Sequence, residues 1–287
     1  MNIGKLKNPM EIANKGLAPR YEKHHGPYSI NWPDLNDMFP GIMDIDYPGL
    51  NPDVNSASTK TNVPAANYGE MNQSETELLY RLISWLKPKT MIEYGTMFGR
   101  STTIMANQSP EDARVITVDL PDRDRYRGDA LLTTDSLFMT DEMVKPENKM
   151  PVGGRIHTSP YKNKITPVRM DARSQQFRET LDDFLESGPI DFALIDAAHD
   201  YFTTKDLFEY TLPLMSEGGV IMTDDYGKVA THNGILTFFG EKAIKEGYVF
   251  YWLCPFGDPN YKDPGSLIYI NVDGAQRDWG KGNTEFP

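Results

Sequence analysis

The segment Met91–Ser101, with the sequence MIEYGTMFGRS, decides the fold because two glycines join an apolar run to a helical pattern. Met91–Tyr94 is predicted to be a buried strand, and Phe98–Asn107 is predicted to be a helix. Gly95 permits a positive φ where the strand ends, and Gly99 permits close approach of the backbone to a ligand. The spacing G-x-x-x-G lacks the middle glycine of the dinucleotide fingerprint, which argues against a nicotinamide cofactor.

Strands and helices alternate outward from this segment. A helix is predicted from Leu78 to Leu86, with Ser74 and Glu77 as a capping box and Pro88 at its end. The further predicted strands are Val115–Val118, Ile165–Val168, Phe192–Ile195, Val220–Met222, Tyr248–Leu253 and Leu267–Val272, and the further predicted helices are Ser174–Glu186, Tyr201–Met215 and Asn233–Glu246. The alternation predicts a doubly wound α/β fold whose sheet has seven strands and is mostly parallel. The last two strands follow each other without a helix, so an antiparallel terminal strand is expected.

The texture of the sequence divides the chain into parts. Residues 1–70 are rich in proline yet carry apolar side chains, which predicts an N-terminal arm or cap packed on a core. Residues 71–273 form the predicted main domain, and residues 274–287 a C-terminal tail. Between the strand ending at Asp119 and the next strand lie 45 residues, 120–164. Because connections of about 2–6 residues are usual, this surplus predicts an insertion that forms a lid over the site.

Composition limits the classes of protein that the chain can represent. The 287 residues include 39% hydrophobic residues, enough for a core, and carry a formal net charge of −12. So acidic a surface argues against a nucleic-acid partner. The single cysteine, Cys254, excludes an intramolecular disulfide and a cysteine-based zinc site. No apolar run can span a bilayer, and the first residues lack the apolar core of a secretory signal, so no membrane role and a cytoplasmic location are expected.

Acidic residues follow several of the predicted strands. Asp119 stands where a carboxylate accepts hydrogen bonds from ribose hydroxyls, and together with Glu93 it favours a nucleoside-type cofactor. Asp196, Asp224 and Asp225 follow two other strands, whose ends meet at one edge of a parallel sheet. Three carboxylates at one place repel one another unless a cation holds them, and hard oxygen ligands suit Mg²⁺, Ca²⁺ or Mn²⁺. The alternative is that Asp224 and Asp225 only cap the segment that follows.

Four segments in this order resemble class I S-adenosylmethionine-dependent methyltransferases. Within that class they are most similar to the metal-dependent O-methyltransferases of small molecules, of the natural-product and sugar type. The segments are Glu93-x-Gly95-x-x-x-Gly99-x-Ser101 followed by Asp119, Ile165–Ala172, Ile190–Tyr201 and Leu212–Tyr226. The resemblance implies a Rossmann-like domain and S-adenosylmethionine as cofactor. The residues implied at the cofactor are Glu93, Gly95, Thr96, Phe98, Gly99, Ser101, Asp119, Asp171, Ala172 and Asp196, with Asp171 at the adenine amino group.

The resemblance also implies a reaction, the transfer of a methyl group to a hydroxyl of a small molecule. A divalent metal, with Mg²⁺ preferred, would be held by Asp196, Asp224 and Asp225 and would chelate the acceptor. His199 titrates near neutrality and is the candidate general base, although a role in orienting Asp196 is an equal alternative. The competing hypotheses are a metal-independent N- or O-methyltransferase, a non-catalytic module that binds S-adenosylmethionine, and a nicotinamide-dependent oxidoreductase. The apolar arm also allows a homo-oligomer.

Overall fold

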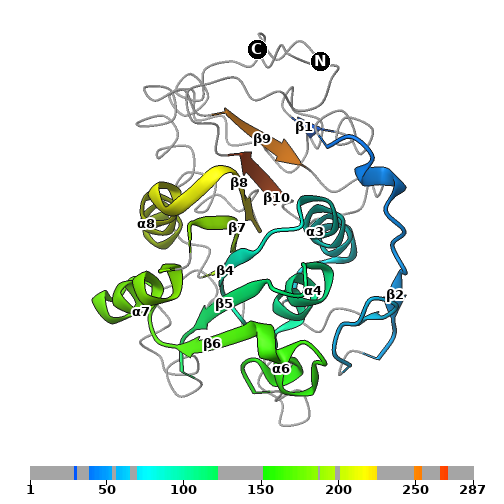
Figure 1. The fold of residues 1–287 in the computed structure, drawn as a ribbon, viewed down its shortest axis with the longest axis horizontal. Coiled ribbons are helices and arrows are strands. Elements are labelled where there is room, and N and C mark those ends of the chain that lie inside the picture. Colours follow the sequence, from blue (N-terminus) through cyan, green and yellow to red (C-terminus); the bar gives the residue numbers. More distant parts are fainter. Residues whose placement is uncertain are drawn as a thin grey trace.

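The structure of the chain is a computed structural model. It describes residues 29–30, 39–53, 56–64, 70–121, 151–186, 188–197, 201–224, 249–253 and 266–270. These residues form a large sheet with helices on both faces (Figure 1) and a second small sheet of β2 (Leu50–Asn51) and β3 (Val63–Pro64). The α/β architecture predicted from the alternation of strands and helices is therefore confirmed.

The large sheet has the strand order β1-β9-β10-β8-β7-β4-β5-β6 among the described residues. Its strands are β1 (Ser29–Ile30), β4 (Thr90–Tyr94), β5 (Arg114–Asp119), β6 (Ile165–Arg169), β7 (Ile190–Ile195), β8 (Met215–Thr223), β9 (Val249–Leu253) and β10 (Ser266–Ile270). The run β8-β7-β4-β5-β6 is parallel, and β10 pairs antiparallel with both β8 and β9. The described sheet has one strand more than the seven predicted, because the two residues of β1 pair with β9.

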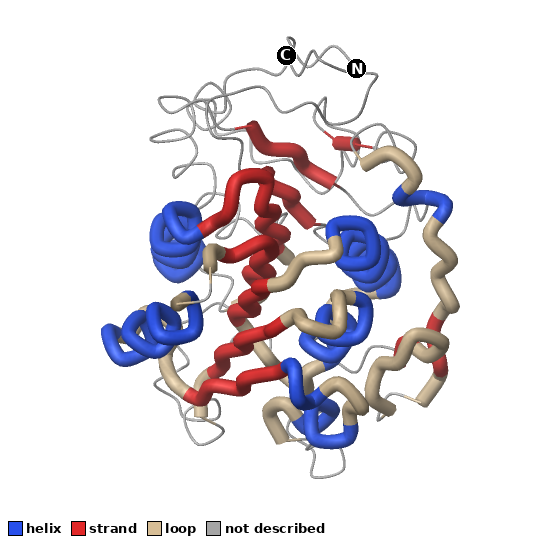
Figure 2. Tube along the Cα trace, viewed as in Figure 1, coloured by secondary structure: helices blue, strands red, loops and turns tan. Residues whose placement is uncertain are grey.

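Helices cover both faces of the sheet (Figure 2). One face carries α3 (Gln73–Leu86), α4 (Arg100–Gln108) and α6 (Gly154–Thr158), and the other face carries α7 (Gln175–Leu185) and α8 (Tyr201–Thr211). The described residues include short 3-10 helices at connections, namely Ile42–Asp44, Lys162–Lys164 and Leu212–Leu214. None of the described helices is long and apolar enough to cross a membrane.

One predicted helix is shorter than expected, and another lies outside the described residues. The helix predicted over Tyr201–Met215 ends at Thr211, because Pro213 lies in a 3-10 turn and Met215 already belongs to β8. Proline removes a backbone donor, so this turn separates helix from strand. The helix predicted over Asn233–Glu246 lies outside the described residues.

The alternation of side chains along β4 divides the interior into two cores. Met91 packs among the side chains of α3 and α4, whereas Ile92 and Tyr94 pack among those of α7 and α8. Successive side chains of a strand point to opposite faces, so Glu93 belongs to the side of α4. This alternation brings the carboxylate of Glu93 to the hydroxyl of Ser101 on that helix.

The start of α3 differs from the prediction. Its N-cap is Asn72, whose side chain accepts a hydrogen bond from the Glu75 backbone N–H at 3.0 Å, and the Glu75 carboxylate accepts from the Asn72 N–H at 3.2 Å. The capping box predicted at Ser74 and Glu77 is therefore wrong by two residues. Both pairs have the same spacing, and the earlier pair caps because the helix extends by one further half turn.

The described N-terminal residues are anchored on α3. The Arg81 guanidinium donates from Nη1 to three backbone carbonyls of this segment. These belong to Ile42, Met43 and Ile45, at 2.5–3.3 Å. Trp85 donates from its indole N–H to the Pro40 oxygen at 2.8 Å, and Phe39 is fully buried against its ring. Residues 39–45 are thus part of the interior packing of this face.

β6 is the outer strand at one end of the described sheet and carries Pro167 at its centre. Thr166 and Pro167 are exposed, whereas Ile165 and Val168 are buried. Proline in a sheet is confined largely to such outer strands, since it cannot donate to a neighbouring strand. The position of this residue is therefore consistent with the order of the strands.

Candidate functional site

The carboxyl ends of the parallel strands lie side by side, as the sequence predicts. The backbone N–H of Gly95 donates to the Val118 oxygen at 2.9 Å, which aligns the ends of β4 and β5. On the other side of β4, the Asp196 N–H donates to the Tyr94 oxygen at 2.9 Å. The Asp224 N–H donates in turn to the Ile195 oxygen at 3.0 Å. One edge of the sheet therefore presents, in register, the residues Asp224, Asp196, Gly95 and Asp119.

Gly95 is required at this edge by space as well as by conformation. Its φ is +102°, and a Cβ atom placed on it would come within 1.7 Å of the Asp196 carbonyl oxygen. A side chain here would collide with backbone, which cannot move aside as a flexible side chain can. The sequence predicts the positive φ, and the structure adds the contact with β7.

Glu93 is fully buried in β4, two residues before Gly95. Its carboxylate accepts hydrogen bonds from the hydroxyls of Ser101 and Thr117, each at 2.5 Å, and from that of Thr102. Burial raises the pKa of Glu93 from 4.5 to about 7, the three hydroxyl donors oppose this rise, and the nearby negative charge of Asp196 adds to it. Glu93 thus ties the first turn of α4 to β4 and β5.

The glycine loop, defined here as Gly95–Gly99, has an unusual backbone at Met97. The φ of Met97 is +46°, in the left-handed region that non-glycine residues seldom adopt. Its N–H donates to the Asp119 carboxylate at 2.7 Å, and its carbonyl accepts from the Gly153 N–H at 2.7 Å. Both polar groups of the residue are therefore held, which is how a strained conformation persists.

The remaining loop residues predicted at the cofactor contact the protein itself in this structure. Thr96 is buried and its hydroxyl lies 2.7 Å from that of Thr117, and Phe98 is buried as well. Gly99 has a φ of +85°, and a Cβ atom there would come within 2.8 Å of the Ile156 side chain. Close approach at Gly99 is thus explained by α6, in addition to the predicted approach of a ligand.

Asp171 and Ala172 lie in the turn between β6 and α7. The Asp171 carboxylate accepts a hydrogen bond from the Arg173 N–H at 2.8 Å and pairs with the Arg173 guanidinium at 3.3 Å. Its side chain is 45% exposed, so the group is accessible at the edge next to Asp119. The Met170 N–H donates to the Asp119 oxygen at 3.0 Å, which places this turn at the end of the β5–β6 ladder.

Two of the three predicted metal ligands, Asp196 and Asp224, lie at neighbouring strand ends, and Asp224 is 6% exposed. The third, Asp225, and the candidate base His199 lie outside the described residues. Within the part of the chain that the structure describes, no three acidic, histidine or cysteine side chains form a metal-binding group. Asp196 and Asp224 alone do not make a metal-binding group, so the metal site remains a prediction.

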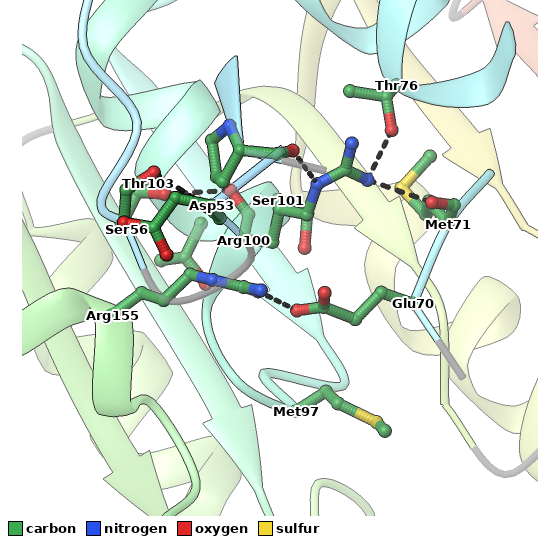
Figure 3. A network of polar contacts seen from close by, with 12 residues as sticks. Asp53, Ser56, Glu70, Met71, Thr76, Met97, Arg100, Ser101, Thr103 and Arg155 are labelled. Carbon is green, nitrogen blue, oxygen red and sulfur yellow. Dashed lines mark hydrogen bonds and ion pairs between the residues drawn. The ribbon is translucent and has the colours of Figure 1, made fainter. Parts of the chain in front are cut away.

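A buried cluster beside the glycine loop was not predicted from the sequence. Figure 3 shows Arg155 of α6 paired with Glu70, and Arg100 of α4 bound to the carbonyl of Met71 and the hydroxyl of Thr76. Arg155 and Arg100 are 0% and 2% exposed. Burial lowers the pKa of Arg100 to about 10, and the Glu70 carboxylate opposes this effect. The sequence signal was an arginine next to each of two glycine motifs, which surface loops also display.

The sequence and the fold of this chain are both similar to those of known methyltransferases. Residues 92–226 match the model of a family described as a methyltransferase domain. The O-methyltransferase from Bacillus cereus in complex with S-adenosylhomocysteine is 18% identical, with a TM-score of 0.51 over 72% of this chain and 84% of that chain. The O-methyltransferase TomG from Streptomyces achromogenes, involved in tomaymycin synthesis and solved with S-adenosylmethionine, is 17% identical, with a TM-score of 0.51 over 70% and 82%.

No curated protein matches this chain in sequence. The predicted resemblance to class I S-adenosylmethionine-dependent methyltransferases is nevertheless confirmed by the family model and by the solved structures. The fold of the chain is the α/β Rossmann-like methyltransferase fold with a mostly parallel sheet. At identities of 18% and 17%, these two structures show a shared fold, and a fold by itself does not specify a reaction.

Proposed function

We propose that the protein transfers a methyl group from S-adenosylmethionine to a hydroxyl of a small molecule, with the help of a divalent metal. The observation that carries this proposal is the edge on which Asp224, Asp196, Gly95 and Asp119 follow one another in register. It supplies acidic groups for a ribose on one side of Gly95 and for a cation on the other. In open α/β sheets, ligands bind at such carboxyl ends.

The residues of the edge fit S-adenosylmethionine. The Asp119 carboxylate, at the end of β5, would accept hydrogen bonds from the ribose hydroxyls. The Asp171 carboxylate, in the turn after β6, would accept one from the adenine amino group. Glu93 and Ser101 would keep the first turn of α4 against the glycine loop through their 2.5 Å hydrogen bond. The proposed binding set also contains Thr96, Phe98, Gly99, Ala172 and Asp196. When bound, the cofactor supplies an electrophilic methyl group on its sulfonium.

The same edge fits a hard cation through Asp196 and Asp224, with Asp225 as the proposed third ligand. Carboxylate oxygens are the ligands that Mg²⁺ prefers. A divalent ion bound there would lower the pKa of a hydroxyl that it contacts. His199 follows Asp196 by three residues and is proposed to accept the proton of the acceptor. The remaining task of the protein is to hold the acceptor oxygen in line with the methyl group.

Further parts of the proposal rest on the sequence. The acceptor is proposed to carry neighbouring hydroxyls, as natural products and sugars do, because two oxygens can bind one ion. The cytoplasm is the proposed compartment, and residues 1–70 are proposed to form a cap on the domain of residues 71–273. A nucleic-acid acceptor is disfavoured by the net charge of −12.

Titration calorimetry tests the cofactor first. S-adenosylhomocysteine should bind to the purified protein, and NAD should not. Binding of NAD without binding of S-adenosylhomocysteine would falsify the proposal in favour of an oxidoreductase. Methyl transfer from labelled S-adenosylmethionine to a panel of catechols and vicinal polyols tests the metal, since EDTA should abolish it and Mg²⁺ should restore it. Full transfer in EDTA would leave a metal-independent methyltransferase.

A further inference from the structure

The residues just before β6 form a support around the glycine loop. This support, residues 151–158, is called the α6 segment here. The Gly153 N–H donates to the Met97 oxygen at 2.7 Å, and the Arg155 N–H donates to the Phe98 oxygen at 3.0 Å. The α6 segment therefore donates hydrogen bonds to two consecutive carbonyls of the glycine loop.

Packing reinforces these two hydrogen bonds. A Cβ atom placed on Gly99 would lie 2.8 Å from the Ile156 side chain. A Cβ atom placed on Gly153 would lie 3.7 Å from the Thr96 methyl group. Val152 and Ile156 are buried. The described end of the predicted lid is thus packed on the loop, whereas residues 122–150 lie outside the described residues.

One ion pair connects the α6 segment to the N-terminal part of the chain. The Arg155 guanidinium pairs with the Glu70 carboxylate, and their side chains are 0% and 4% exposed. The next residue, Met71, gives its carbonyl to Arg100 at 2.8 Å, and Arg100 is the first residue of α4. Through the adjacent residues Glu70 and Met71, the contacts therefore connect the α6 segment to the start of α4, and Figure 3 shows both the ion pair and the Arg100–Met71 hydrogen bond.

A pair buried this deeply is weak evidence for stability, because removing both charges from water offsets most of their attraction. Its better-attested use is to specify one geometry among several. The geometry at stake here is the left-handed backbone of Met97, whose carbonyl is held by the α6 segment.

We propose that Glu70 and Arg155 are positioning residues for the cofactor. Their ion pair keeps the α6 segment against the glycine loop and so preserves the loop conformation that S-adenosylmethionine meets. This inference rests on the proposed function, because it takes the glycine loop as the cofactor loop. Neither residue is proposed to touch the cofactor.

The test uses the full chain carrying Glu70→Leu and Arg155→Met together. Removing both charges avoids an unpaired buried charge, so the variant should fold even where Arg155→Met alone does not. The control is Lys205→Met with Glu209→Leu, which removes an i,i+4 ion pair of 3.0 Å on α8, on the other face of the sheet from α4 and α6. All proteins are compared at a temperature at which they are fully folded.

Two readouts separate positioning from stability. Amide exchange of residues 96–100 in the free protein should become faster in the first double variant and stay unchanged in the control. The dissociation constant for S-adenosylhomocysteine should rise about tenfold in the first double variant only. Unchanged exchange and unchanged affinity would overturn the proposal.

The two proposals fail in distinguishable ways. If the unchanged protein does not bind S-adenosylhomocysteine, the proposed function is overturned together with the cofactor role of the pair. Faster loop exchange with unchanged affinity would overturn only the cofactor role, and would show a loop support that ligand binding does not need.

Discussion

Gly95 and Asp196 touch through their backbones at the point where β4 and β7 end. A Cβ atom on Gly95 would stand 1.7 Å from the Asp196 carbonyl oxygen and 2.7 Å from its carbonyl carbon. Gly95→Ala should therefore force the two strand ends apart and lower the free energy of unfolding by more than about 4 kcal/mol. Urea denaturation of the variant measures this loss.

Gly188→Ala is the matched control for this prediction. Gly188 also has a positive φ, +137°, but a Cβ atom there meets nothing within 4 Å. Its substitution should cost only the backbone strain, about 1–3 kcal/mol. Equal losses at the two positions would show that conformation alone, and not the contact with Asp196, requires Gly95.

Asp119 is expected to act on the cofactor in two ways. Asp119→Ala removes the proposed ribose acceptor and the acceptor of the Met97 N–H. Each charged hydrogen bond is worth about 1.5–3 kcal/mol, so the affinity for S-adenosylhomocysteine should fall by at least about tenfold. Asp119→Asn keeps an acceptor oxygen and should lose less. Calorimetry that finds equal affinities for all three proteins contradicts the ribose role.

Asp224 should serve the metal and leave the cofactor undisturbed. Asp224→Asn removes one carboxylate charge, so binding of Mn²⁺, followed by its paramagnetic resonance signal, should weaken by about tenfold or more. The affinity for S-adenosylhomocysteine should stay the same, because the proposed ribose and adenine contacts lie across Gly95. Asp112→Asn, at an exposed position in the turn before β5, controls for the loss of charge. Mn²⁺ binding that survives Asp224→Asn would contradict the ligand assignment.

Glu93 should make stability depend on pH. Its pKa is about 7 in the folded protein, above its ordinary value of 4.5, so folding favours the protonated carboxyl. The protonated group contributes fully below pH 4.5, and this contribution is lost as the pH rises to about 7. When the pH is raised from about 5 to about 8, the free energy of unfolding of Glu93→Gln should increase by roughly 3 kcal/mol relative to that of the unchanged protein. Urea denaturation curves that differ equally at both pH values would contradict the assignment.

Local apolar pattern predicted much of the fold. Met91–Tyr94 and Val115–Val118 read as buried strands because parallel strands are covered on both faces, and both runs lie within β4 and β5. The neighbouring positions of Asp196 and Asp224 also followed from the pattern, since each ends such a run. The residue that follows each strand can be identified from the local sequence, and the parallel arrangement of the strands places these residues at one edge of the sheet.

Non-local contacts were beyond prediction from the pattern. Arg155 follows two glycines, a local pattern that does not indicate burial, yet it is fully buried and pairs with Glu70, which stands 85 residues away in sequence. The capping box was misplaced for a different reason. Asn72 with Glu75 and Ser74 with Glu77 satisfy the same spacing, and only the tertiary position of the helix start selects between them.

Pro167 has a consequence for how copies of this protein meet in solution. An outer strand normally offers a row of backbone donors and acceptors on which a strand from another chain can assemble. In β6 the exposed centre of that row is proline, which has no donor, so the row is interrupted at its third residue. This interruption protects the β6 side of the sheet against fibre-like growth from molecule to molecule.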